Sequence, residues 1–110
     1  MGPAMTSRYC MIYVTAGSHE EAVKIARALV AEKLAACANV LGPAHSIYRW
    51  QGKVEEAQEI VVIAKTRRDF ADQAMARIKV LHSYDVPCAV AYDIAAGLPD
   101  YLAWIDQETT

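Results

Sequence analysis

The chain has 110 residues, of which 55% are hydrophobic, and its formal net charge at pH 7 is −2. This length suits one domain with its own core, and the weak negative charge excludes the basic surface expected of a protein that binds nucleic acid or anionic membranes. An apolar run such as residues 60–64 is far too short to cross a bilayer. We therefore expect a single domain over residues 8–110, with no nucleic-acid or membrane partner, after a disordered tail over residues 1–7.

The cysteines bear on the compartment. Cys10, Cys37 and Cys88 form an odd number in a chain large enough to fold without disulfides. Reduced thiols are the simplest interpretation, and the first residues show no signal-peptide pattern. Together these features predict a cytoplasmic location.

The first predicted elements are a strand and a helix. Residues 9–15 are rich in β-branched and aromatic side chains, which is typical of a strand. Ser18 with Glu21 matches a capping box, the pattern in which a hydroxyl and a carboxylate satisfy free N–H groups at a helix start. Apolar residues then recur at helical spacing, so we expect a helix over residues 19–34.

Two long strands follow. Residues 36–50 have no helical face, and Gly42 and Pro43 interrupt them, which predicts a bent or bulged strand. Gln51-Gly52 is a hairpin signal. Residues 53–66 then form the longest strand candidate.

The last third of the chain predicts a helix, a strand and a short helix. Thr66 with Asp69 resembles another helix cap, and the second amphipathic helix should end near His82. Residues 89–94 read as a fourth strand, and Asp100 can cap a short helix at the C-terminal end.

The element order is therefore β-α-β-β-α-β with a terminal helix, which is the α+β, ferredoxin-like split βαβ sandwich. Two helices should cover one face of a four-stranded antiparallel sheet. Apolar residues occupy both alternating sets of positions in the strands at 36–50 and 53–66, so the other face also needs cover. A partner subunit is the simplest cover.

Several motifs stand in order along the chain. They are EKLAACAN at 32–39, YRWQGK at 48–53, Glu59, Lys65-Thr66, HSYDVP at 82–87 and Tyr101-Leu-x-Trp104. Together they closely resemble the CutA divalent-cation tolerance family. The resemblance implies a ferredoxin-like protomer assembled as a PII-like homotrimer, a link to copper and other divalent metal ions, no catalytic reaction and no organic cofactor.

At the positions where the resemblance implies metal ligands, the sequence departs from the family pattern. A cysteine that some members carry at the end of the first strand is Val14 here, and a second histidine is Leu81. Ser83 replaces a proline, Asp85 a glutamate and Cys88 the last glutamate. Of the copper ligands that the resemblance implies, only His82 carries over.

We take His82 and Cys88 as candidate metal ligands, with Cys37 as a possible third. Imidazole and thiolate suit copper or zinc, and a thiolate suits Cu(I) in particular. Further ligands could come from Asp85 or a neighbouring subunit. The alternatives are that His82 merely ends a helix, and that Cys37 and Cys88 are ordinary core residues.

Two further sets of residues point to subunit contacts. Tyr48, Trp50, Tyr84 and Trp104, with Tyr101, are of the kind that anchors interfaces, and ordinary core packing is the alternative. Glu59 and Lys65 lie six residues apart on one strand and so on one face. They could form a polar pair lining a cleft between subunits, or a solvated edge.

Two other functions share the fold class. An acylphosphatase-like hydrolase needs an arginine in an anion-binding loop after the first strand, but residues 15–19 read TAGSH. A PII-like small-molecule sensor needs a long loop between the second and third strands, where only Gln51-Gly52 is available. The favoured interpretation is a non-catalytic homotrimeric cation-tolerance protein that binds copper or another divalent metal ion.

Overall fold

The computed structural model describes residues 7–110, so the predicted tail at 1–7 lies outside the described residues except for Ser7. The element order confirms the predicted α+β class. The elements are β1 (Tyr9–Ala16), α1 (His19–Ala31), β2 (Cys37–Trp50), β3 (Lys53–Arg67), a 3₁₀ turn at Arg68–Phe70, α2 (Ala71–Leu81), β4 (Ala89–Asp93) and α3 (Pro99–Glu108). No helix among the described residues is long and apolar enough to span a membrane.

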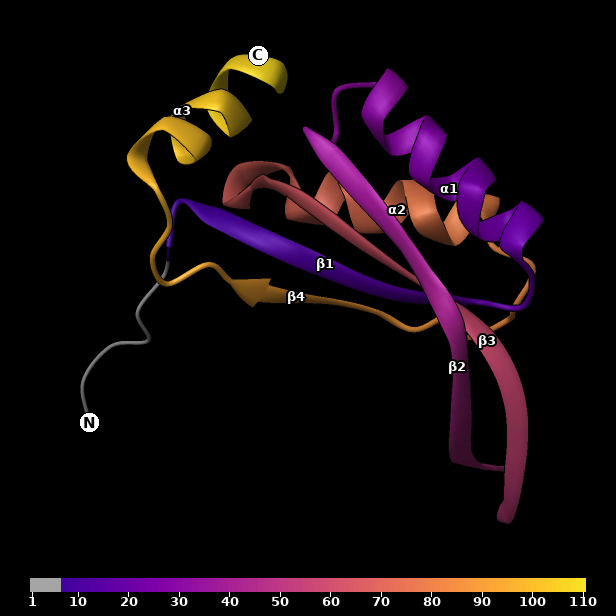
Figure 1. Cartoon of the computed structure of the whole chain (residues 1–110). Coiled ribbons are helices and arrows are strands. Elements are labelled where there is room, and N and C mark those ends of the chain that lie inside the picture. The colour runs from indigo at the N-terminus through magenta and orange to yellow at the C-terminus, as the bar shows by residue number, and fades with distance from the viewer. Residues whose placement is uncertain (1–6) are drawn as a thin grey trace.

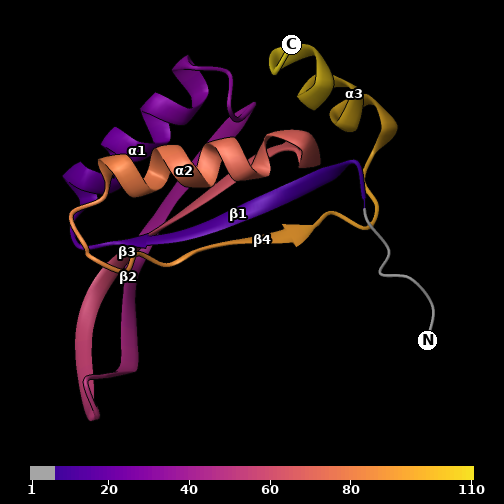
Figure 2. The ribbon, with the colours of Figure 1, turned by 180° about the vertical axis from the view of Figure 1, so that it is seen from behind.

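The four strands form one antiparallel sheet in the order β2-β3-β1-β4. Helices α1 and α2 lie side by side on the same face of this sheet, as Figures 1 and 2 show from opposite sides. The other face carries no helix from the described part of the chain (Figure 1). The molecule is therefore two layers deep, with its core between the sheet and the helix pair.

Alternation along the strands decides which side chains enter that core. Ile12 lies opposite Ala64 on β3 and Ala91 on β4. Because neighbouring residues in register point to the same face, this set packs together against the helices. Ile12 itself is fully buried, as are Ile25 of α1 and Ile78 of α2, which belong to the same cluster. Removing this surface from water is the main term that stabilises the fold.

The remaining strand positions form what we call the open sheet face. Tyr13 lies opposite Ile63 on β3 and Val90 on β4. These side chains point away from the helices, and Tyr92 on the same face is 57% exposed. The open sheet face comprises Met11, Tyr13, Leu41, Ile63, Val90 and Tyr92.

The β2–β3 hairpin extends well beyond the rest of the sheet. β1 pairs with β3 only from Ile60 onward, so residues 44–50 and 53–59 pair only with each other. We call residues 44–59 the arm, and in Figure 1 it curves away from the body. Gln51 and Gly52 form its turn with φ angles of 52° and 80°, which confirms the predicted hairpin.

The arm begins at a bulge, as predicted. The pairing register shifts between Leu41 and Ala44. Gly42 has a φ of +152°, and a Cβ there would lie 2.9 Å from the Ile60 side chain and 3.3 Å from the Glu59 carbonyl oxygen. Only glycine fits this conformation and this close approach. The bulge thereby sets the direction in which the arm leaves the body.

The predicted start of α1 is confirmed, and its predicted end is wrong. The Ser18 hydroxyl accepts a hydrogen bond from the Glu21 amide at 3.1 Å. The helix ends at Ala31 rather than at residue 34, because Lys33 adopts a left-handed φ of 61°. The Leu34 amide then bonds back to the Leu29 carbonyl at 2.9 Å, which satisfies a helix-end acceptor.

Two predicted caps are also wrong. Thr66 lies inside β3 with a fully buried side chain, and the 3₁₀ turn separates it from α2, which begins at Ala71. Asp100 lies within the first turn of α3, because Pro99 begins that helix and Leu98 precedes it without a side-chain cap. Proline is favoured at a first helical position, where no amide donor is needed.

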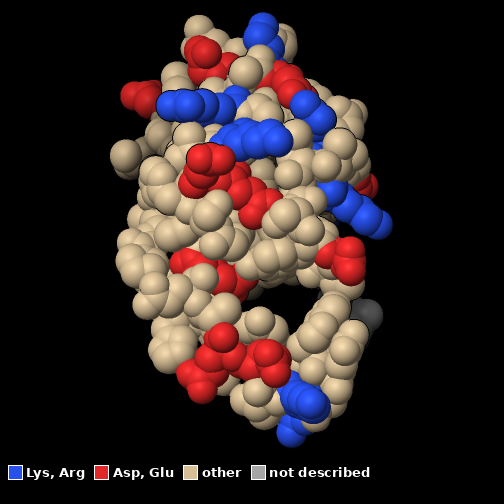
Figure 3. All heavy atoms as spheres, turned by 90° about the vertical axis from the view of Figure 1, so that its right-hand side faces the viewer, with Lys and Arg blue, Asp and Glu red and all other residues tan. Residues whose placement is uncertain are grey.

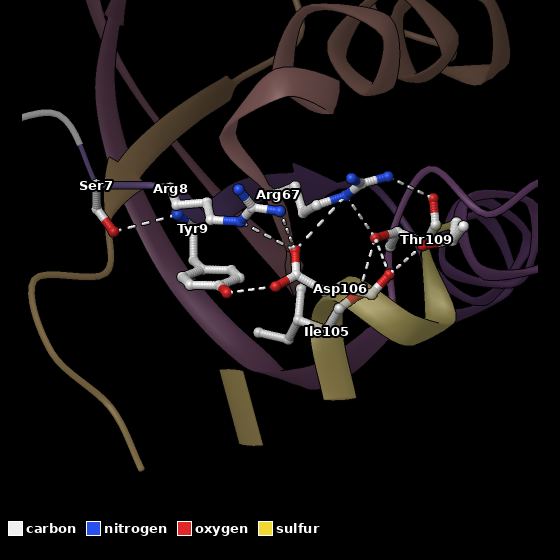
Figure 4. Close-up of polar contacts among 8 residues, drawn as sticks. Ser7, Arg8, Tyr9, Arg67, Ile105, Asp106 and Thr109 are labelled. Carbon is white, nitrogen blue, oxygen red and sulfur yellow. Dashed lines mark hydrogen bonds and ion pairs between the residues drawn. The ribbon is translucent and has the colours of Figure 1, made fainter. Parts of the chain in front are cut away.

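A carboxylate holds α3 to the body (Figure 4). Asp106 accepts a 2.5 Å hydrogen bond from the Tyr9 hydroxyl and a 3.2 Å bond from Arg8 Nε. Next to it, Arg67 donates to the Thr109 hydroxyl at 3.0 Å and to the Thr109 carbonyl at 2.9 Å. The bond from Tyr9 and the bond and charge of Arg8 lower the pKa of Asp106. The ionised carboxylate is therefore the form that anchors α3.

We expect Asp106→Asn to lower the thermal midpoint at pH 7, on the order of 5 °C. A carboxylate whose folded pKa is lowered stabilises the fold above its unfolded pKa of about 3.9, and loses that contribution as pH falls toward the folded value. The difference between wild type and variant should therefore shrink below about pH 4. Differential scanning calorimetry at several pH values measures this, with Glu108→Gln on the same helix as control. A difference that is unchanged at pH 3 would contradict the assignment.

Candidate functional site

A pocket of about 590 Å³ lies between the arm and the body. In Figure 3 the molecule is visibly open where the arm leaves the body, and acidic side chains lie on several sides of this opening. One wall comes from β1 and the arm, and the other from the segment that joins α2 to β4. The lining residues are Thr15, Ser46, Tyr48, Trp50, Glu59, Tyr84, Asp85, Val86, Pro87 and Cys88.

Glu59 and Tyr84 join the two walls. The Tyr84 hydroxyl donates to Glu59 Oε2 at 3.1 Å. Glu59 is only 8% exposed, and its Oε1 makes no hydrogen bond to another described residue. Burial and the neighbouring carboxylate raise the pKa of Tyr84 to about 12, so its hydroxyl remains a donor at neutral pH. Gly17 leaves room for the ring, since a Cβ there would lie 3.1 Å from the hydroxyl.

His82 fixes the segment that carries Tyr84. Its side chain is fully buried, and Nε2 lies 2.7 Å from the Thr15 carbonyl oxygen. Since a carbonyl can only accept, Nε2 carries the proton and donates. Nδ1 accepts from the Tyr84 amide at 3.1 Å. Both ring nitrogens are therefore occupied by backbone groups, one on β1 and one on the pocket wall.

Glu21 adds a second tie at the same place. Its carboxylate accepts from the Ser83 amide at 2.6 Å, from the Ser83 hydroxyl at 3.0 Å and from the Gly17 amide at 3.3 Å. Burial opposes ionisation, but the bonds from Ser83 outweigh it and lower the pKa of Glu21. The capping box marked Glu21 in the sequence, whereas nothing marked its contact with Ser83, which is 62 residues away.

The three predicted metal ligands are not brought together in one chain. Cys88 is exposed at the pocket, and His82 has both nitrogens occupied. Cys37 begins β2, where its Sγ lies 3.3 Å from the hydroxyl of Tyr101 on α3. Within residues 7–110, no three His, Cys, Asp or Glu side chains lie close enough to hold a metal ion. These residues do not fit a metal centre within one chain, and the predicted site now needs ligands from a second copy.

The predicted interface aromatics are all accessible in the single chain. Tyr48 is 43% exposed and Trp50 45%, both on the arm. Tyr84 and Trp104 are each 38% exposed. None of the four belongs to the core cluster, so surface is available at each for a partner, and their role at an interface stays a prediction.

Glu59 and Lys65 do not form a polar pair in one chain. Six residues of strand separate them by about 20 Å. Lys65 Nζ instead donates to Asn39 Oδ1 on β2 at 2.9 Å, and Glu59 bonds Tyr84. They do share the side of β3 that faces away from the helices, so a contact between two copies of the chain stays a prediction.

We expect His82→Ala to destabilise the fold by about 2 kcal/mol, because the buried Thr15 carbonyl and the Tyr84 amide would both lose their partner. Urea unfolding at fixed protein concentration measures the change, and His19→Ala on the surface of α1 serves as control. Equal stability of both variants would show that His82 does not hold the pocket wall.

Comparison with known proteins agrees with this geometry. The chain is 45% identical over 96 residues to the divalent-cation tolerance protein CutA of Archaeoglobus fulgidus, covering 87% of this chain and 93% of that one. The crystal structure of CutA from Xylella fastidiosa superposes with a TM-score of 0.91 at 42% identity, covering 94% of this chain and all of that one. The Archaeoglobus fulgidus relative is named as a tolerance protein, not as an enzyme, in agreement with the non-catalytic prediction.

The predicted cytoplasmic location is wrong. A solved structure with a TM-score of 0.90 and 42% identity, covering 93% of this chain and 99% of that one, is described as the periplasmic divalent cation tolerance protein CutA of Archaeoglobus fulgidus. A relative from Arabidopsis thaliana, 37% identical over 90% of this chain and 54% of its own length, is named chloroplastic. The free cysteines are no guide to the compartment here, because they lie in unlike surroundings. Cys10 is buried in the core, whereas Cys88 is exposed at the pocket.

The match to the family itself covers nearly the whole domain. The sequence model of the CutA1 divalent ion tolerance protein family matches residues 10–108. This range covers all the strands and helices described above, apart from the first residue of β1, Tyr9. Family model, relatives and solved structures all agree. This chain belongs to the CutA1 divalent ion tolerance protein family.

Proposed function

We propose that the chain acts in divalent-cation tolerance as a non-catalytic homotrimer whose subunits bury their open sheet faces against one another. The open sheet face carries the proposal. Val90 is 43% exposed, Leu41 49% and Tyr92 57%, and the two helices cover only the opposite face (Figure 2). A contiguous apolar surface of this kind on a small domain marks an interaction site.

The arm supports the same proposal. Ile47 and Val54 on the arm are 65% and 60% exposed, and a two-stranded hairpin without further cover is marginally stable in water. A neighbouring subunit that packs on the arm removes this surface from water. The number of subunits rests on the resemblance of the chain to a family of PII-like trimers.

We expect Tyr92→Glu to dissociate the assembly, because a carboxylate on the open sheet face cannot be buried without a partner. Light scattering at micromolar concentration should give three times the chain mass for wild type and a lower mass for the variant. The matched control is Val80→Glu, which places the same charge on α2 at a site 74% exposed on the helix side. A monomer mass for wild type would refute the trimer.

The metal part of the proposal concerns the assembly rather than the single chain. Cys88 is the exposed cysteine and lines the pocket, and a thiolate is a soft ligand suited to Cu(I). His82 can serve as a ligand only by giving up one of its backbone bonds. Completion of the shell, by Cys37 or an acidic side chain, requires a second copy.

We expect the assembled protein to bind Cu(I) under reducing conditions, and Cys88→Ser to weaken that binding at least ~10-fold. Binding should also weaken as pH falls, because thiolate ligands must lose their protons. A competition titration with a chromophoric Cu(I) chelator measures both effects. Cys10→Ser is unsuitable as control because Cys10 is buried in the core, so His19→Ala, at an exposed position on α1, serves instead. Unchanged affinity in Cys88→Ser would remove this thiol from the metal proposal.

The two alternative functions find less support. A PII-like sensor loop has no room in the two-residue turn between β2 and β3. In the loop where an acylphosphatase-like enzyme would hold an anion, the Gly17 amide already bonds the Glu21 carboxylate. A negative group at that position opposes anion binding.

A further inference from the structure

We propose that the pocket between the arm and the body binds an organic ammonium group, with Glu59 as its counter-ion and the aromatic rings of Tyr48, Trp50 and Tyr84 as its walls. The inference does not depend on metal binding, and one of the two sources of the ammonium group rests on the assembly proposed above. It starts from the residues that line the pocket.

The first step is the charge of the pocket. Glu59 is only 8% exposed, and its one hydrogen-bond partner among the described residues is the neutral Tyr84 hydroxyl. A buried carboxylate is costly unless it is paired with a positive group. The lining residues include Asp85 as a second acid and no lysine, arginine or histidine. The pocket therefore favours a cation and repels anions.

The second step is the kind of cation. A hard divalent ion needs about six oxygen ligands, and a transition metal needs a cluster of ligating side chains. The pocket offers two carboxylates, and no group of three ligating side chains exists within the described residues. Aromatic rings line the pocket instead, and rings around a carboxylate are the recognised environment of alkylammonium groups. The volume of about 590 Å³ suits a small organic molecule.

The ammonium group can come from two sources. One is a free small molecule that carries an alkylated amine. The other is a lysine of a second copy of this chain, for which Lys65 is the candidate because it lies on the side of β3 away from the helices, where its ammonium group bonds the neutral side chain of Asn39. Both sources use the same carboxylate and the same rings.

The test is isothermal titration of the purified full-length protein with choline, compared with 3,3-dimethyl-1-butanol, its uncharged isostere. Choline should bind at least ~10-fold more tightly than the isostere. Glu59→Gln keeps an acceptor for Tyr84 and removes the charge, so it should weaken choline binding at least ~10-fold. Trp50→Leu should weaken it several-fold.

The matched control is Glu56→Gln. Glu56 lies on the opposite side of the arm, where it bonds His45 at 2.7 Å, so its substitution should leave choline binding unchanged. Fluorescence of Trp50 in a Trp104→Phe background reports occupancy of the pocket directly, and far-UV circular dichroism shows that each variant is folded.

A Lys65→Met variant distinguishes the two sources. If wild type binds choline as tightly as Lys65→Met does, the site takes a free ligand. Choline binding that appears or strengthens at least ~10-fold in Lys65→Met assigns the site to a neighbouring lysine. The proposal is overturned if neither protein binds choline, if the uncharged isostere binds equally well, or if folded Glu59→Gln binds as tightly as wild type.

Discussion

The imidazole of His82 is the constraint on which the site depends. One ring nitrogen donates to the Thr15 carbonyl near the end of β1, and the other accepts from the amide of Tyr84. These two bonds place the segment after α2 against the end of β1, although Thr15 and His82 are 67 residues apart. Tyr84 then reaches Glu59, and Glu59 is the buried carboxylate of the pocket. Because both of its ring nitrogens bond backbone groups, His82 has a structural role in this chain.

The second constraint is the number of layers. Two helices cover one face of the sheet and leave the other to the apolar residues of the open sheet face (Figure 1). Within residues 7–110 no further element covers it, since α3 lies at one end of the sheet, where Asp106 anchors it (Figure 4). The arm likewise exposes apolar side chains, among them Ile47 and Val54. The proposed homotrimer buries both surfaces against other copies, so it predicts that folding and assembly of this chain are thermodynamically linked.

The chemistry of the pocket and the family's association with metal ions are separate matters. Cys88 is a soft ligand at the edge of the pocket, whereas Glu59 is a hard, buried anion surrounded by aromatic rings. The first suits a thiophilic metal and the second an organic cation.

The sequence by itself determined the local elements of this protein. Strand alternation, the Ser18–Glu21 capping box, the two-residue turn at Gln51-Gly52 and the kink at Gly42 depend on neighbouring residues, so local patterns identify them. The predicted caps at Thr66 and Asp100 are wrong because any polar residue near a helix start matches the capping pattern. Thr66 still belongs to β3, and Pro99 begins α3 one residue before Asp100. The motifs identified the family, and the cysteine count misjudged the compartment. Only the tertiary structure decided that His82 is occupied by Thr15 and Tyr84, that Cys37 lies with Tyr101 away from Cys88, and that Glu59 pairs with Tyr84 rather than Lys65. Apart from the bond between His82 and Tyr84, these contacts join segments 25 to 67 residues apart, which the packing of the helices on the sheet brings together and which no local pattern encodes.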